Sequence, residues 1–76
     1  MNLSPRQLRI FVSLAQSLNF SRTAGELCVS QPTLSKLVRE IEEAVGVRLF
    51  ERTTRQVKLT LDGEALLGVA RRMVED

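Results

Sequence analysis

Hydrophobic side chains near the start of the chain recur with the three- and four-residue spacing of one helix face: Leu8, Phe11, Val12, Ala15 and Leu18. This spacing predicts a helix over residues 5–17. The start of the helix is well marked, because Ser4 can cap it, Pro5 suits its first position and Gln7 completes a capping box.

Two shorter patterns predict a second and a third helix. Asn19-Phe20 interrupts the first pattern, and we expect Ser21 to cap a short helix that ends at about Cys28. After a short turn, Ser30 is expected to cap the third helix, and Gly46 is expected to end it. The third helix carries a regular apolar stripe, formed by Leu34, Leu37, Val38, Ile41, Ala44 and Val45.

The remaining residues predict a hairpin and a fourth helix. Leu49–Arg52 and Val57–Thr60 alternate in part between apolar and polar residues, so they read as two short strands joined by a four-residue turn. Thr60 is expected to cap the last helix. The chain is therefore mainly α, with a three-helix core, a β-hairpin and a C-terminal helix.

Composition excludes most enzyme chemistry. The 76 residues include no His and one Cys, which removes Ser-His and Cys-His catalytic pairs, the usual Cys/His zinc sites and an internal disulfide. We expect no enzymatic activity, no cofactor and no metal. Since no apolar run reaches the roughly 20 residues that span a bilayer and the single Cys fits a reducing compartment, we expect a cytoplasmic protein without a membrane partner.

The small net charge of +2 conceals an uneven distribution of charge along the chain. Residues 48–59 carry four cations against one acid, and residues 21–39 carry three cations against one acid. An acidic stretch at Glu40, Glu42 and Glu43 separates them. Such segregation forms an electrostatic footprint for a polyanion if folding brings the two basic stretches together.

The second and third helices, joined by a short turn, describe a helix-turn-helix. At 100° per residue, the polar residues of the third helix's first half lie opposite its apolar stripe. Short polar groups and cations on this face suit base edges and phosphates in the major groove. The expected base contacts are Gln31, Pro32, Thr33, Ser35 and Lys36, and the expected backbone contacts are Ser21, Arg22, Ser30 and Arg39.

The hairpin adds a basic wing to this motif. Its turn region concentrates Arg52, Thr53, Thr54 and Arg55, which we expect to meet a minor groove or the neighbouring phosphates. The predicted fold is therefore a winged helix-turn-helix. Residues 1–60 are assigned to the DNA-binding domain and residues 61–76 to the fourth helix, which the family resemblance described next implies to be the start of a linker and dimerisation helix.

Several motifs resemble those of the LysR-type transcriptional regulators. They are Phe20-Ser21-Arg22-Thr23-Ala24, Val29-Ser30-Gln31-Pro32-Thr33-Leu34-Ser35, Gly46-Val47-Arg48-Leu49-Phe50-Glu51-Arg52, Val57-Lys58-Leu59-Thr60 and Gly63. The resemblance implies a bacterial regulator with its recognition helix, residues 31–45, in the major groove and its wing, residues 49–60, at the minor groove. It also implies an interrupted palindromic operator, and an effector-binding domain beyond the present chain that alone would bind a small molecule.

The fourth helix carries more apolar surface than one core requires. Its apolar residues span an arc of roughly 200°, where about 100° suffices for a helix that packs on one side. We therefore expect a two-fold homodimer through this helix, as the resemblance also implies. The residues assigned to this contact are Leu61, Ala65, Leu66, Val69, Ala70 and Met73.

Two alternatives remain at this stage. In one, the hairpin and the last helix dock onto an acidic protein partner, with no dependence on DNA sequence. In the other, the chain belongs to a different winged-helix regulator family, although the stretch from Ser30 to Ser35 argues against it.

Overall fold

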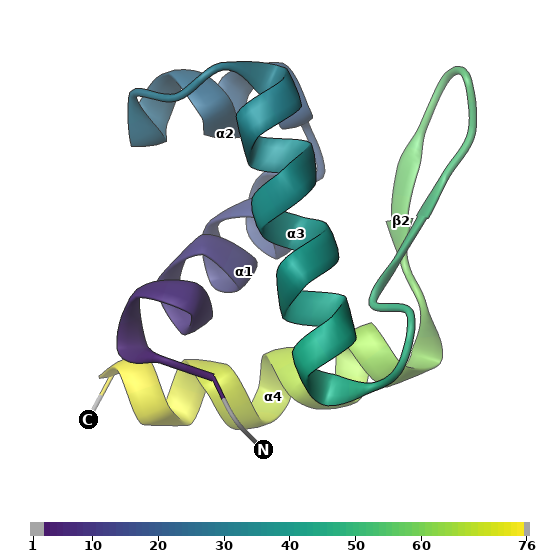
Figure 1. The fold of residues 1–76 in the computed structure, drawn as a ribbon. Coiled ribbons are helices and arrows are strands. Elements are labelled where there is room, and N and C mark those ends of the chain that lie inside the picture. The colour runs from purple at the N-terminus through teal and green to yellow at the C-terminus, as the bar shows by residue number, and fades with distance from the viewer. Residues whose placement is uncertain (1–2, 76) are drawn as a thin grey trace.

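The computed structural model describes residues 3–75 and confirms a mainly α, winged helix-turn-helix architecture over that range (Figure 1). The elements in chain order are α1 (Pro5–Ser17), α2 (Phe20–Leu27), α3 (Gln31–Val45), β1 (Phe50–Arg52), β2 (Val57–Leu59) and α4 (Leu61–Glu75). None of the helices in the described range is long and apolar enough to cross a bilayer.

The capping box predicted at the start of α1 is present. The Gln7 amide donates to Ser4 Oγ at 3.1 Å, and the Ser4 amide donates to Gln7 Oε1 at 2.9 Å. The helix ends at Leu18, which adopts a left-handed conformation with φ of 52° and donates its N–H to the Leu14 carbonyl. A left-handed residue turns the chain sharply, so α2 can begin immediately.

The predicted start of α2 was wrong. Asn19, not Ser21, caps the helix, and its side-chain oxygen accepts the Arg22 N–H at 3.0 Å. Asn caps helices as well as Ser does. The earlier start makes Phe20 the first helical residue and buries its ring in the core.

The third helix begins and ends as predicted. The Thr33 N–H donates to Ser30 Oγ at 3.2 Å, and Gly46 ends α3 at a φ of 82°, where a side chain would be strained. Leu34, Val38 and Ile41 are buried. Ala44 is exposed, contrary to the predicted stripe, because it lies about 60° around the helix from Ile41 and faces solvent in the last turn.

The hairpin strands pair antiparallel, with Phe50 opposite Leu59 and Arg52 opposite Val57. Each strand is one residue shorter than predicted. The Thr60 N–H donates to the Leu49 carbonyl in continuation of this register, but the reciprocal bond is not made. The Leu49 N–H donates to the Glu42 carboxylate instead, and the Thr60 carbonyl accepts the Glu64 N–H.

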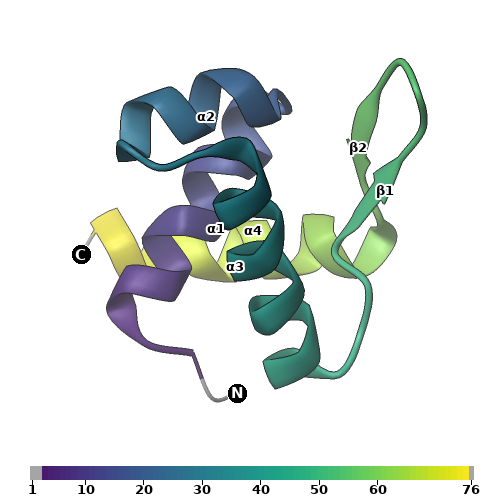
Figure 2. The same ribbon diagram turned by 45° about the horizontal axis from the view of Figure 1, so that its top comes forward.

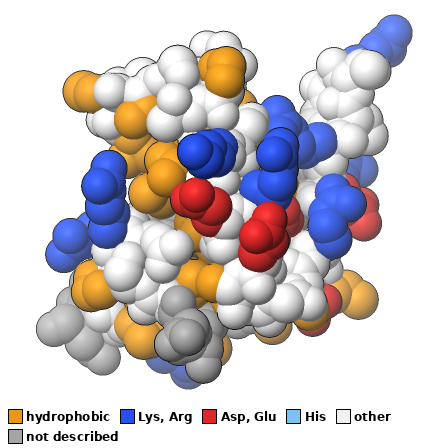
Figure 3. Space-filling model, in the orientation of Figure 1, with side chains coloured by type: hydrophobic (Ala, Val, Ile, Leu, Met, Phe, Trp, Pro, Cys, Tyr) orange, Lys and Arg blue, Asp and Glu red, His pale blue; other side chains and the backbone are white. Residues whose placement is uncertain are grey.

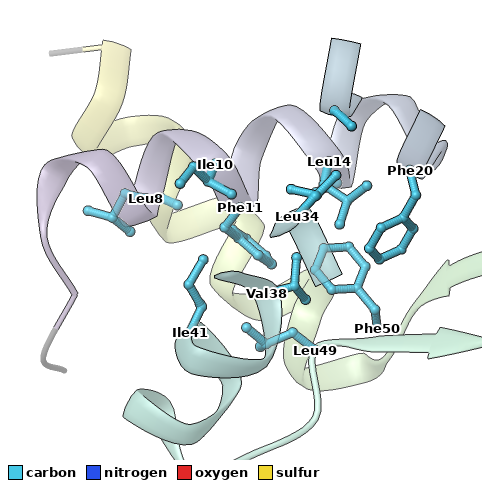
Figure 4. Packing of buried hydrophobic residues seen from close by; sticks show 13 residues of the cluster. Leu8, Ile10, Phe11, Leu14, Phe20, Leu34, Val38, Ile41, Leu49 and Phe50 are labelled. Carbon is cyan, nitrogen blue, oxygen red and sulfur yellow. The ribbon is translucent and has the colours of Figure 1, made fainter. Parts of the chain in front are cut away.

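The base of the hairpin belongs to the hydrophobic core, whereas its tip extends away from the helices (Figures 1 and 2). Phe50 is buried and meets Phe11 of α1 with ring centroids 5.5 Å apart (Figure 4). Leu49 is also fully buried. The wing is thus anchored at one end and exposed at the other.

The fourth helix lies across α1, at the end of the molecule opposite the hairpin tip (Figure 1). Thr60 caps it as predicted, since Thr60 Oγ1 accepts the Gly63 N–H at 2.9 Å. Asp62 and Glu64 in its first turn and Arg72 in its last turn complement the helix dipole.

Candidate nucleic-acid interface

The first half of α3 presents a polar face to solvent. Its buried side chains, Leu34 and Val38, lie against the core. The five residues predicted to read bases surround them on the outer side: Gln31, Pro32, Thr33 and Lys36 are exposed, and Ser35 is half-buried. Arg39 follows on the same helix and is exposed.

A groove of about 620 Å³ separates the helix-turn-helix from the hairpin. Asn19, Phe20, Ser21 and Gln31 line one side of it, and hairpin residues 52–58 line the other. In Figure 3, cationic side chains gather over α3 and beside the base of the hairpin, with acidic side chains among them on α3, and another cation lies at the far end of the hairpin. The two basic stretches of the sequence are therefore adjacent in the fold.

Arg52 is the last residue of β1, next to the hairpin turn, and its side chain points toward the helices rather than toward the tip. Its guanidinium carbon is 3.9 Å from the centre of the Phe20 ring, a cation–π geometry. Its Nη1 donates to Ser35 Oγ at 3.2 Å. The Arg52 guanidinium is therefore held by α2 and α3, while the residue stays exposed and lines the groove, and its contact with DNA as a wing residue stays a prediction.

The hairpin turn is closed by Thr53. Its N–H donates to the Gln56 carbonyl at 2.8 Å, and its hydroxyl oxygen accepts the N–H groups of Arg55 and Gln56. The Thr53 hydroxyl is also within 3.3 Å of the Gln56 carbonyl. Thr53 is thus committed to the turn, whereas Thr54 and Arg55 are exposed at it.

The residues predicted to contact the DNA backbone are not all in one place. Ser21 lines the groove, as its position in the first turn of α2 requires. Arg22 instead lines a separate hollow with Ser13 and Ser17 of α1. Arg39 lines a depression at the base of the hairpin that Ser35 and Arg52 share.

Three residues of this region escaped the sequence prediction. Lys58 lines the groove from β2, opposite Glu51 in the strand register. Asn19 caps α2 at the groove edge, and its residue type marks it as a candidate cap but does not separate it from Ser21. Glu42 accepts the N–H groups of Leu49 and Phe50 at 2.7 and 3.2 Å, a contact that no sequence spacing indicates.

The apolar arc of α4 divides into two faces. Leu61, Val69 and Met73 are exposed, at 85%, 42% and 54%, and Ala65 is exposed as well. The assignment of Ala70 to a dimer contact was wrong, because this residue is fully buried in the chain's own core. Leu66 is half-buried against the same core, and the side chain of Val74, also part of the predicted arc, lies outside the described residues.

The model of a known protein family matches residues 5–64, and its description is a bacterial regulatory helix-turn-helix protein of the lysR family. The match covers most of the chain and both halves of the groove. The chain belongs to the lysR family. Among the alternatives left open by the sequence, a different winged-helix family is thereby excluded.

Individual members of the lysR family agree with this assignment. The chain is 49% identical over 70 residues to the Hca operon transcriptional activator HcaR of Escherichia coli K12, which covers 92% of the chain and 24% of HcaR. It is 43% identical over 79 residues to the transcriptional regulator YnfL of the same strain, which covers 100% of the chain and 27% of YnfL. It therefore spans about a quarter of the length of the curated relatives it matches.

Solved structures of this family share the fold. The crystal structure of a BenM DBD/catB site 1 DNA complex superposes with a TM-score of 0.88 at 34% identity, over 96% of this chain and 81% of the BenM chain. The lysR domain described here thus has the same fold as the BenM domain that was crystallised in complex with DNA.

Proposed function

We propose that this lysR-family chain binds double-stranded DNA in a sequence-specific manner. The observation that carries the proposal is the groove, because the start of α2 and Gln31 at the start of α3 line one side of it and the cationic hairpin lines the other. A helix of this kind fits the major groove, and a protruding basic hairpin fits the adjacent minor groove. BenM, whose domain shares the fold, is seen in complex with DNA.

The exposed residues divide between two roles. Gln31, Thr33 and Lys36 can reach base edges from the first turns of α3, with Pro32 offering apolar contact to a thymine methyl group. Arg55 and Lys58 on the hairpin, with Arg39 on α3, are suited to phosphates. Glu40 and Glu43 lie further along α3, so insertion by the N-terminal half keeps their carboxylates away from the backbone of DNA.

The relatives are transcriptional regulators, and we propose the same role for the protein that contains this chain, with no enzymatic activity and in the cytoplasm. Its domains would be residues 1–60 for DNA binding and residues 61–76 for the start of the linker helix. A small-molecule effector would bind outside this chain.

We further propose a two-fold dimer through α4, and hence an interrupted palindromic operator. The exposed side chains of Leu61, Val69 and Met73 offer apolar surface along α4, and Met73 also lines a hollow with the first residues of α1. In a two-fold dimer, the same apolar surface of α4 on a second chain would cover this one, because a two-fold contact pairs identical surfaces.

Selection of bound duplexes from a random DNA pool tests the proposal. We expect enrichment of one motif, which the chain should bind at least tenfold more tightly than a scrambled duplex in fluorescence anisotropy. Equal affinity for both duplexes would overturn sequence-specific binding. Binding to an acidic protein with no preference among duplexes would instead support the protein-interaction alternative.

A further inference from the structure

Two hydroxyl groups on the recognition face of α3 already accept a hydrogen bond from within the protein. Ser35 Oγ accepts from Arg52, and Thr33 Oγ1 accepts from Ser30. A hydroxyl has one O–H donor and two lone pairs. What the protein does with the lone pairs decides what each hydroxyl can still offer to a ligand.

The direction of the Ser35 contact is fixed by chemistry. A guanidinium group has no acceptor, so Arg52 must donate and Ser35 Oγ must accept over the 3.2 Å distance. The charged Arg52 guanidinium draws electron density from Ser35 Oγ. As a result, the Ser35 O–H becomes a stronger donor and the remaining lone pair of Ser35 Oγ becomes a weaker acceptor. Ser35 is half-buried at the lip of the depression it shares with Arg52.

In the Thr33 contact the Ser30 hydroxyl is the donor. Ser30 Oγ accepts the N–H of Thr33 at 3.2 Å, and the Ser30 hydroxyl donates onward to Thr33 Oγ1 at 2.9 Å. The Thr33 hydroxyl therefore accepts this hydrogen bond, and its own O–H is not used as a donor in it. Thr33 is exposed in the first turn of α3, two residues after the groove residue Gln31.

We propose that α3 presents Thr33 and Ser35 to DNA as hydrogen-bond donors, and that Arg52 is the positioning residue that gives Ser35 this role. The inference rests on the proposed DNA binding and deepens it. Each hydroxyl then selects an acceptor on DNA: a purine N7, a guanine or thymine carbonyl, or a phosphate oxygen. The amino groups of adenine and cytosine are donors, so they are disfavoured opposite both side chains.

Arg52 is held for this role by α2. Its guanidinium stacks on Phe20, a core residue, and reaches Ser35 from that fixed position. Arg55, three residues further along the hairpin, has the same charge and is exposed at the turn. It therefore serves as the matched control for loss of one cation from the hairpin.

Coupling between Ser35 and Arg52 is the first test. On the duplex selected from the random pool, Ser35→Ala should weaken binding by about 3- to 10-fold, the typical effect of one hydrogen bond. In an Arg52→Gln background the same change should weaken binding by less than twofold, whereas in an Arg55→Gln background it should keep its full effect. An unchanged effect of Ser35→Ala in the Arg52→Gln background would overturn the role of Arg52.

Modified DNA identifies the acceptor and needs no change at Arg52. Base analogues that each lack one major-groove acceptor, such as 7-deazaguanine and 7-deazaadenine, are placed singly along the selected duplex, and methylphosphonates replace single phosphates. We expect two modified positions in the DNA to weaken binding of the wild-type protein, one for each hydroxyl. The effect of the first should disappear in Ser35→Ala, and the effect of the second should disappear in Thr33→Val, which removes the hydroxyl and keeps the branched shape. A base analogue with this behaviour identifies base reading, and a methylphosphonate identifies a backbone contact.

The two levels of inference fail differently. If wild type binds the selected and scrambled duplexes equally, the proposed function fails. If wild type binds selectively but both hydroxyl variants respond to every modified duplex as wild type does, only the donor assignment fails. Thermal unfolding of each variant, followed by circular dichroism, confirms that the comparison is between folded proteins.

Discussion

Gly63, in the first turn of α4, lies directly against the backbone carbonyl of Leu49, with no room for a side chain between them. The same carbonyl accepts the Thr60 N–H at 3.0 Å, and the Thr60 hydroxyl donates to the Arg48 carbonyl at 2.7 Å. The start of the wing and the start of α4 are thus joined through backbone groups rather than through long side chains.

Replacement of Gly63 by Ala should therefore destabilise the fold. The new methyl group would collide with the Leu49 carbonyl and with the Leu59 side chain, and overpacking of this kind lowers the free energy of unfolding by about 1–3 kcal/mol. Gly68→Ala is the control, because nothing lies within 4 Å of its added Cβ and the helix should gain about 0.5–1 kcal/mol. Urea titrations followed by circular dichroism measure both, and equal shifts would contradict the close approach.

Glu42 should contribute more to stability than its charged neighbours. Its side chain is 17% exposed and accepts the N–H groups of Leu49 and Phe50, whereas its partner Arg48, at 3.9 Å, is 72% exposed and adds little. Glu42→Ala should lower the free energy of unfolding by about 1.5–3 kcal/mol, and Glu43→Ala by less than about 0.5 kcal/mol. Chemical denaturation compares the two variants, and similar losses would show that the amide contacts do not anchor the wing.

Arg55 should act on DNA without regard to sequence. Arg55→Ala is expected to weaken binding about equally for all duplexes and to reduce the slope of log affinity against log salt by about one unit. Anisotropy titrations at several salt concentrations give both quantities, with Arg6→Ala on the exposed side of α1 as the control. A loss limited to one base position would assign Arg55 to base reading instead.

Gln31 and Thr33 should affect sequence preference rather than overall affinity. Gln31→Ala and Thr33→Ala are each expected to reduce discrimination at particular base pairs by roughly 1–3 kcal/mol. A panel of single-base variants of the selected duplex shows the effect, and Gln16→Ala on α1 should leave the panel unchanged. Uniform weakening across the panel would point to phosphate contacts.

Val69 and Val47 offer a matched test of the α4 dimer, since both are 42% exposed and only Val69 lies on α4. We expect light scattering after size exclusion, at concentrations well above micromolar, to give the mass of two chains for wild type and for Val47→Glu. Val69→Glu should give the mass of one chain, because a buried carboxylate without a partner is unfavourable. A wild-type chain that stays single under these conditions would overturn the dimer.

Local signals in the sequence sufficed for most of the fold. The capping box at Ser4, the cap at Ser30 and the stop at Gly46 each act within a few residues, so periodicity and residue type locate them. The second cap failed because Asn19 and Ser21 are equally good candidates locally. Only the burial of Phe20 against the distant core decides between them.

The sequence does not indicate which side chains of the candidate interface are held by contacts within the protein and which are exposed. Arg52 and Arg55 look alike in the sequence, and only the packing of β1 beside α2 and α3 separates a guanidinium stacked on Phe20 from one exposed at the turn. Ala70 shows the same limit on α4. An apolar arc indicates that a helix has two apolar faces, but not which of them covers its own core.

The junction at Thr60 has a mechanical consequence. Thr60 follows the last strand of the wing and caps α4, so no flexible segment separates the two elements. The wing and α4 are thus joined by the single residue Thr60 and by the contacts of Thr60 and Gly63 with the Leu49 carbonyl. In a pair of chains joined through α4, the angle between the two helices would set how far apart the two wings stand, and hence the spacing of the DNA half-sites that the pair can span.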